Sequence, residues 1–318
     1  MLETNAKHHE IYGKTFQALR LGRTTIYTAD PDNLTAVFGT NWKEWGTGRA
    51  NAMEPFCGPG FVTREGEEWR AYRTLFASTL NEANAVNLHL LSKAYKQYMK
   101  ELPSNGESVD LAPIFDKLSS CKPKNARKKP DRNSLTNNSR DPEIWSRLRE
   151  EVAGMGPVED WRAPDLKNLK LLHNCIKESL RIYPLFHANG RVATTDTTLP
   201  TGGGPDGTAP IFIPTGTRVS TNFYALHRDK AVFGEDINTF NPDRWNFISP
   251  SSWEFMPFSH GPRSCAGRHK ALGEASYIIA RMVVEFKRIE SRDDRPWTEN
   301  VKLVVKNGNG CHVAVRPA

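Results

Sequence analysis

The chain has 318 residues, of which 38% are hydrophobic, and its mean hydropathy of −0.57 is typical of a globular protein with one large core or two smaller ones. No run of 18 apolar residues occurs and the first residues do not form a signal peptide, so the sequence predicts neither a membrane-spanning helix nor an N-terminal anchor. Five cysteines without CxxC spacing argue against a zinc site and favour a reducing compartment. The net charge of +7 is compatible with acidic partners or an anionic membrane surface.

The first part of the chain predicts short strands and helices. Residues 24–28 have strand composition, and Asp30-Pro31 is typical of an N-cap followed by proline in the first helical turn. A loop rich in glycine and proline is expected from Pro55 to Gly66. A helix that carries Trp69 and Arg73 is expected to follow it.

The composition changes between residues 119 and 140. Six lysines or arginines lie between Lys122 and Arg132, with two prolines and almost no apolar residues, which predicts a disordered junction. The same basic run could bind nucleic acid, but it has no interleaved aromatic residues and no recognisable motif. We therefore expect no nucleic-acid partner.

Helical patterns dominate after the junction. Asp141-Pro142 predicts another capped helix start, and apolar residues recur at helical spacing from Leu166 to Leu180, ending before Pro184. Residues 191–222 predict strands and turns, with a loop at Gly202–Gly204, and apolar spacing from Ala271 to Phe286 predicts a last helix. The expected fold class is mainly α with a small β region.

The most informative segment runs from Phe258 to Gly267 and reads FSHGPRSCAG. It places Cys265 between two glycines, just before the predicted last helix, where the helix N-terminus favours a thiolate. Arg263 adds a cation two residues before the sulfur. Such a loop suits a soft metal ligand, and the alternative is a cysteine buried in a turn.

Phe258, Gly261, Arg263, Cys265 and Gly267 resemble the ligand loop of the cytochrome P450 family, the heme-thiolate monooxygenases. The resemblance implies a cytochrome P450 fold and heme b as cofactor. It also implies that Cys265 is the axial ligand, a thiolate that pushes electron density onto the iron.

The resemblance extends to a buried ionic triad. Glu178 and Arg181 are three residues apart, which alone describes an ordinary pair on a helix surface. Downstream, the sequence FNPDRW contains Arg244, and in the family such an arginine joins the glutamate–arginine pair. The three are expected to lock a helix to the segment that frames the heme, without taking part in the chemistry.

Further residues match the family's cofactor contacts. Trp69 and Arg73 form a WxxxR pattern, whose alternative is an amphipathic helix with one aromatic residue in the core. By resemblance Trp69, Arg73, Arg191 and Arg263 contact the heme propionates, and Phe258 and Gly267 frame the ligand loop. Cations there would neutralise two carboxylates of a largely buried cofactor.

Two pieces characteristic of the family are expected to be absent. One is the N-terminal anchor, and the other is a block of helices between Leu118 and Asp141 that includes the distal helix with its acid–alcohol pair. No catalytic residue is therefore assigned. The expected organisation is a single truncated cytochrome P450 domain, residues 1–318, with an N-terminal part (1–118), a basic junction (119–140) and a C-terminal part with the ligand loop (141–318).

These features leave two alternatives. In the first, the chain hydroxylates a small lipophilic substrate such as a fatty acid or alkane, as the sequence LPTGGGPDGTAPI at 199–211 resembles the fungal branch with that activity. It would use O₂ and electrons from an NADPH–cytochrome reductase. In the second, it is a non-catalytic remnant with weak or no heme binding. The family is found at the endoplasmic reticulum membrane, whereas a chain without an anchor is expected to be cytoplasmic or peripheral.

Overall fold

A computed structural model describes residues 2–20, 22–80, 86–103, 105–120, 141–301 and 304–318. The chain forms two compact units, each assembled from three stretches of sequence. Unit 1 comprises Met1–Thr79, Pro184–Asn238 and Ile248–Ala266, and unit 2 comprises Leu80–Tyr183, Thr239–Phe247 and Gly267–Ala318. The predicted junction lies outside the described residues, apart from its first two, which end helix α6.

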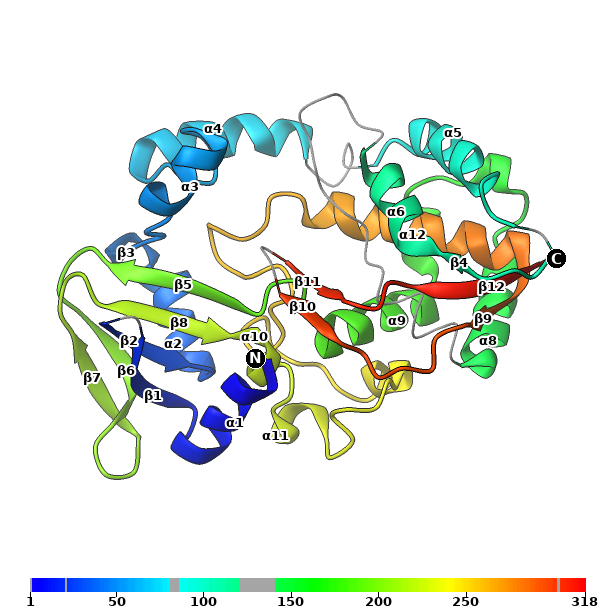
Figure 1. Cartoon of the computed structure of the whole chain (residues 1–318). Coiled ribbons are helices and arrows are strands. Elements are labelled where there is room, and N and C mark those ends of the chain that lie inside the picture. The colour runs from blue at the N-terminus through cyan, green and yellow to red at the C-terminus, as the bar shows by residue number, and fades with distance from the viewer. Residues whose placement is uncertain (1, 21, 81–85, 104, 121–140, 302–303) are drawn as a thin grey trace. The chain divides into compact units, whose positions relative to one another are not determined.

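Unit 1 is built around a five-stranded sheet with the order β1-β2-β8-β5-β3 (Figure 1). Strand β2 pairs with β8 in parallel, and the other neighbours are antiparallel. The strands are β1 (Thr15–Arg20), β2 (Arg23–Thr28), β3 (Trp45–Gly46), β5 (Ala188–Ala193) and β8 (Arg218–Asn222). Strands β6 (Thr197–Gly203) and β7 (Ala209–Ile213) form a separate antiparallel hairpin.

Some helices of unit 1 pack against its strands, and α4 carries part of the site. They are α1 (Leu2–Tyr12), α2 (Pro31–Thr35), the π-helical turn η1 (Ala36–Thr40), the 3₁₀ turn η2 (Trp42–Glu44), α3 (Ala50–Cys57), α4 (Gly66–Thr79), α10 (Phe223–Leu226) and α11 (Lys230–Phe233). The predicted cap at Asp30 is confirmed, since its carboxylate accepts hydrogen bonds from Asp32 N and Asn33 N. The loop expected from Pro55 starts later, because α3 continues through Pro55 to Cys57.

The core of unit 1 lies between the sheet and these helices. Leu34, Val37 and Phe38 of the α2–η1 segment pack against Ile26 and Val219 of the sheet, and all five are nearly inaccessible to solvent. These three side chains therefore form the buried face of the α2–η1 segment.

Unit 2 is mainly helical and places α12 among its other helices (Figure 1). Its helices are α5 (Leu88–Met99), α6 (Leu111–Ser120), α8 (Pro142–Ala153), α9 (Lys170–Ile182) and α12 (Arg268–Glu285), with 3₁₀ turns η3 (Val158–Asp160), η4 (Asp165–Asn168) and η5 (Pro242–Asn246). Strands β4 (Val109–Asp110), β12 (His312–Pro317) and β9 (Phe286–Ser291) form one sheet, and β10 (Glu299–Val301) pairs with β11 (Val305–Asn307).

Local sequence signals explain the ends of these helices. Asp141 caps α8 by accepting hydrogen bonds from Glu143 N and Ile144 N, as predicted. The helix expected from Leu166 is split, because Leu166 lies in η4 and α9 begins only at Lys170. The last helix ends at Glu285, and Phe286 starts strand β9.

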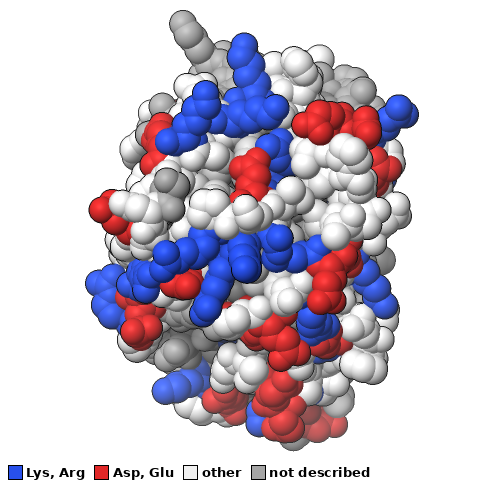
Figure 2. Space-filling model, turned by 90° about the vertical axis from the view of Figure 1, so that its right-hand side faces the viewer, with Lys and Arg blue, Asp and Glu red and all other residues white. Residues whose placement is uncertain are grey.

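The surface of unit 2 mixes charges of both signs. On the face in Figure 2, lysines and arginines form a band bordered by acidic side chains. In the β9–β12 sheet, Arg288, Arg292 and Arg316 all lie within ion-pair distance of Glu290. In the described part of the chain, no helix is both long and apolar enough to span a bilayer.

Candidate functional site

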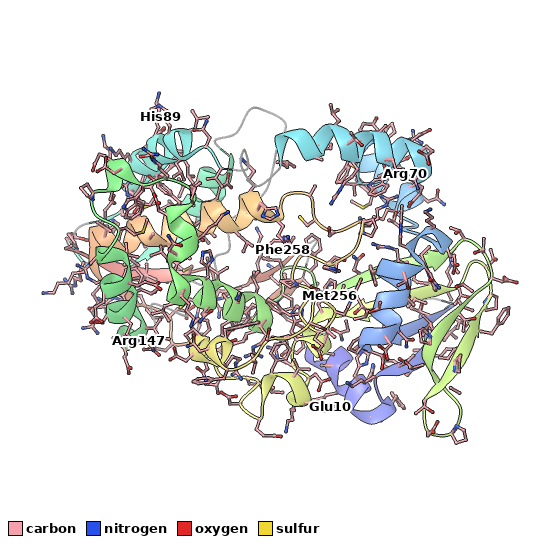
Figure 3. All side chains as sticks on the ribbon, turned by 180° about the vertical axis from the view of Figure 1, so that it is seen from behind. Glu10, Arg70, His89, Arg147, Met256 and Phe258 are labelled. Atoms are coloured by element: carbon pink, nitrogen blue, oxygen red, sulfur yellow. The ribbon has the colours of Figure 1, made fainter. Side chains whose placement is uncertain are left out.

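Residues 258–265, here called the ligand loop, are held in shape by their own backbone. Cys265 N donates to Phe258 O at 3.0 Å, and Ser264 N donates to Gly261 O at 3.0 Å. Ser259 adopts a φ of 59°, in the left-handed region, and its N–H donates to Met256 O. Figure 3 labels Phe258, the first residue of the loop, and Met256, which precedes it. The loop therefore presents a half-buried Cys265 from a closed turn.

Gly261 lets the loop lie directly against the π-helical turn η1. Its φ is 77°, and a Cβ atom there would be 1.9 Å from Phe38 O, so no other residue fits without moving the backbone. On the same turn, a Cβ at Gly39 would be 2.7 Å from the ring of Trp253. That ring contacts His260 edge-to-face, with a centroid separation of 4.6 Å. Two close approaches thus fix the loop on the core of unit 1.

Three of the predicted cations come together beside this loop within unit 1. Arg73 of α4 donates from Nη1 to Ser264 O at 2.8 Å, next to Cys265 in sequence. Arg263 stacks on the ring of Trp69 at 4.2 Å, which places the buried Trp69 beneath a cation. Arg191 of β5 is 3% exposed and lies 4.4 Å from the ring centre of Phe38.

A fourth cation, Arg49, was missed by the sequence analysis. Its Nη2 donates to Asn189 Oδ1 at 3.0 Å, and Arg191 Nη1 donates to the same oxygen at 3.2 Å. Arg49 lies between β3 and α3, in a segment without a motif, so no sequence signal pointed to it. We call Arg49, Arg73, Arg191 and Arg263 the arginine cluster.

The positive charges of the arginine cluster are poorly compensated. Burial lowers the pKa of Arg191 well below its ordinary value, and repulsion from Arg49 and Arg263 lowers it further. Burial is also the main cause of the lowered pKa of Arg49, Arg73 and Arg263. Within the described residues, the carboxylate of Glu65 opposes this trend by pairing with Arg263. The cluster therefore has the electrostatics of an anion-binding site.

In unit 2 the structure brings Glu178, Arg181 and Arg244 together. Glu178 Oε1 accepts from Arg181 Nη2 at 2.8 Å and from Arg244 Nε at 3.0 Å, and Glu178 Oε2 accepts from Arg181 Nε at 2.9 Å. The glutamate and Arg181 are fully buried. Asn241 N and Trp245 Nε1, which were not predicted, also donate to this carboxylate at 3.0 Å. We call Glu178, Arg181 and Arg244 the glutamate triad.

Gly267, the last residue predicted for the site, is the N-cap of α12 in unit 2. Its carbonyl accepts a hydrogen bond from Ala271 N at 2.9 Å, which opens the first turn of the helix. Arg268, His269 and Lys270 follow in that first turn. Gly267 is thus placed at a helix start, as the sequence predicted.

A sequence profile of the cytochrome P450 family matches residues 132–312, which is more than half of the chain. The chain belongs to the cytochrome P450 family. The match includes the ligand loop and the whole glutamate triad. Family membership identifies an oxidoreductase, and the family as a whole uses a heme cofactor.

Two fungal P450 monooxygenases are similar over nearly the whole chain. One, from Aspergillus japonicus, is 27% identical over 436 residues and aligns with 100% of this chain and 78% of its own length. Another, from Fusarium mangiferae, is 28% identical over 99% of this chain and 83% of its own length. Cytochrome P450 52A3-A of Candida maltosa is 41% identical, over 56% of this chain and 36% of its own length.

The residues of unit 1 fit a heme group. Heme carries two propionates, and the arginine cluster provides four guanidinium groups, of which those of Arg49, Arg191 and Arg263 share the carboxylate of Glu65. The thiol of Cys265 supplies the ligand type that the family uses for iron. The donor set therefore matches both the acidic edge and the metal of the cofactor.

Proposed function

We propose that Cys265 is the axial thiolate ligand of heme b and that the arginine cluster holds its propionates. The observation that carries this proposal is the closed ligand loop with the arginine cluster around it, in which three of the four cations share the carboxylate of Glu65. Bound heme would supply the activation of O₂ for insertion of one oxygen atom into a C–H bond. The protein's own contribution is to fix the sulfur on a rigid turn and to neutralise the propionates.

The contacts give each side chain a distinct task. Arg73 reaches Ser264 O and so ties α4 to the ligand loop at the position before Cys265. Trp69 supports Arg263 from below its guanidinium plane, and Asn189 orients Arg49 and Arg191 by accepting from both. Phe258 closes the loop through its carbonyl, which accepts from Cys265 N. Gly267 starts α12 immediately after the loop.

We further propose that the substrate is a small lipophilic molecule such as a fatty acid or alkane, and that electrons come from an NADPH–cytochrome reductase. The resemblance of residues 199–211 to the fungal branch that hydroxylates fatty acids and alkanes supports this substrate class. We also propose that the chain is cytoplasmic or binds peripherally to the endoplasmic reticulum membrane, where the family is found.

A second candidate is a P450 remnant that does not turn over substrate. The alignment with the Aspergillus japonicus protein spans 436 positions, whereas this chain has 318 residues, so at least 118 positions hold residues of the relative alone. This excess supports a truncated P450 fold that lacks a central block of helices. Without that block, bound heme would be exposed on its distal face and held less tightly.

A spectrum of the reduced protein with carbon monoxide tests the proposal. Purified protein reconstituted with hemin should show the red-shifted Soret band of thiolate ligation, and Cys265→Ser should abolish the shift while the protein stays folded. A band that is unchanged in Cys265→Ser would contradict the assignment of the ligand. Consumption of NADPH with a reductase and a fatty acid then separates the two candidates, since the remnant would bind heme without turnover.

A further inference from the structure

The partly exposed carboxylate of Glu65 is held in unit 1 by contacts on both of its oxygens. Oε1 accepts from Thr47 N at 2.7 Å and also from Thr47 Oγ1, and Thr47 is 3% exposed. Oε2 pairs with Arg263 Nη2, which also donates to Arg64 O at 2.8 Å. Glu65 thus bridges the end of β3, the start of α4 and the ligand loop.

This one carboxylate acts on several cations of the arginine cluster. It raises the pKa of Arg49, Arg191 and Arg263 against the effect of burial, so it lies within electrostatic range of all three. Those cations also repel one another, because Arg49 lowers the pKa of Arg191 and of Arg263. In the absence of another anion, Glu65 relieves this repulsion.

We propose that Glu65 is an internal counter-ion that competes with the heme propionates for the arginine cluster. The inference rests on the proposed function, in which this cluster binds the propionates. A propionate that approaches Arg263 meets a negative charge already in place, so part of the attraction is lost. Glu65 therefore stabilises the heme-free protein and lowers its affinity for heme.

A positioning role for Glu65 makes the opposite prediction. If Glu65 served to hold Arg263 in the geometry that receives a propionate, its removal would weaken heme binding. Glu65→Gln separates the two roles, because glutamine keeps the size and the hydrogen-bond acceptor facing Thr47 but loses the charge. The backbone contact at the start of α4, from Trp69 N to Glu65 O, is unaffected by the change.

The matched control is Glu68→Gln in the first turn of α4, three residues after Glu65. Glu68 is exposed and pairs with Arg64 Nε at 3.1 Å, and Arg64 is outside the arginine cluster. A change that reflects only the net charge of α4 would appear equally in both variants.

Titration of the heme-free proteins with hemin, followed at the Soret band, should show binding about fivefold tighter in Glu65→Gln than in wild type. Glu68→Gln should match wild type. With hemin dimethyl ester, whose propionate charges are masked, the gain of Glu65→Gln should disappear. Glu65→Asp keeps the charge and should gain less than Glu65→Gln, which gives a second variant if glutamine disturbs folding.

A second measurement needs no heme. Without ligand, Glu65→Gln should unfold at a lower temperature than wild type, and inorganic pyrophosphate should raise its Tm by more than it raises that of wild type. Equal or weaker hemin binding in Glu65→Gln, or an equal gain with the dimethyl ester, would overturn the inference. If no variant binds hemin, the proposed function fails, and the pyrophosphate comparison alone decides whether Glu65 is the counter-ion.

Discussion

The glutamate triad of unit 2 and the arginine cluster of unit 1 both bury guanidinium groups, but they balance the charge differently. In the triad, one fully buried carboxylate accepts five hydrogen bonds, from Arg181, Arg244, Asn241 and Trp245. In the cluster, Arg49, Arg191 and Arg263 share Glu65, whose side chain is 43% exposed. The triad is complete without a ligand, whereas the cluster becomes balanced only when an anion arrives. A buried ion network whose carboxylate is fully hydrogen-bonded therefore indicates a structural role. A cluster with excess positive charge indicates an anion-binding site.

Glu178→Gln should change the stability of the protein most, because it leaves two buried guanidinium groups without their counter-charge. The free energy of unfolding is expected to fall by about 3–5 kcal/mol. Urea unfolding followed by circular dichroism measures this loss. Glu150→Gln, at an exposed position on α8, serves as the control and should change stability by less than about 0.5 kcal/mol. A loss below about 1 kcal/mol at Glu178 would show that the triad is not the structural network described above.

Arg191→Met should stabilise the heme-free protein, whereas Glu178→Gln destabilises it. The reason is that Arg191→Met removes a buried charge that the protein alone does not balance. Stability of the heme-free protein is expected to rise by about 1 kcal/mol, while hemin binding should weaken about tenfold through the loss of a propionate contact. Thermal unfolding and hemin titration provide the two readouts. Arg70→Met, at an exposed position on α4 (Figure 3), should alter neither by much. Loss of stability in Arg191→Met would mean that Arg191 is a structural residue like those of the triad.

The smallest change in stability is expected when the ion pair between Arg147 and Asp243 is removed. This pair lies on the surface of unit 2. Asp243 Oδ1 and Oδ2 accept from Arg147 Nη2 and Nη1 at 2.6 and 2.9 Å, and this hydrogen bonding lowers the pKa of the Asp243 carboxyl. Because the folded pKa lies below the unfolded value of about 4, the stabilisation is present above that pH and is lost as the pH falls. Both side chains are more than a third exposed, so screening limits the contribution to less than about 1 kcal/mol.

Asp243→Asn tests the pair through its pH dependence. The stability difference between wild type and variant should be largest near pH 7 and should shrink as the pH falls below the unfolded pKa of about 4, as measured by urea unfolding at each pH. A difference that persists at low pH would show that Asp243 acts through packing or hydrogen bonds that do not depend on its charge.

Signals that depend on neighbouring residues were predicted from the sequence. The caps at Asp30 and Asp141 need only the next few residues, and Glu178 with Arg181 needs one turn of helix. The helix of Trp69 and Arg73 and the closed turn before Cys265 were found for the same reason. The split between Leu166 and Lys170 was missed, because apolar spacing continues across it although the backbone changes from 3₁₀ to α.

Contacts between segments that are far apart along the chain could not be predicted from the sequence. Arg49 and Asn189 are 140 residues apart, and Glu65 meets Arg263 across 198 residues. Nothing in their local composition marks these side chains as partners, since an exposed glutamate or an arginine in a loop is ordinary. Arg244 was predicted only through the family resemblance. Its neighbours Asn241 and Trp245 were not predicted, because they donate hydrogen bonds to a carboxylate more than 60 residues away in the sequence.

The contact between Gly261 and the carbonyl of Phe38 has a consequence for natural variation in this chain. Any other residue at position 261 would displace the turn that carries Cys265 from its contact with Phe38. Where the protein still needs the cofactor, selection therefore removes substitutions at this position. A population that has abandoned the cofactor would accumulate changes at this position as freely as on the surface. Polymorphism at codon 261, compared with that at exposed codons, therefore reports whether selection still maintains the site.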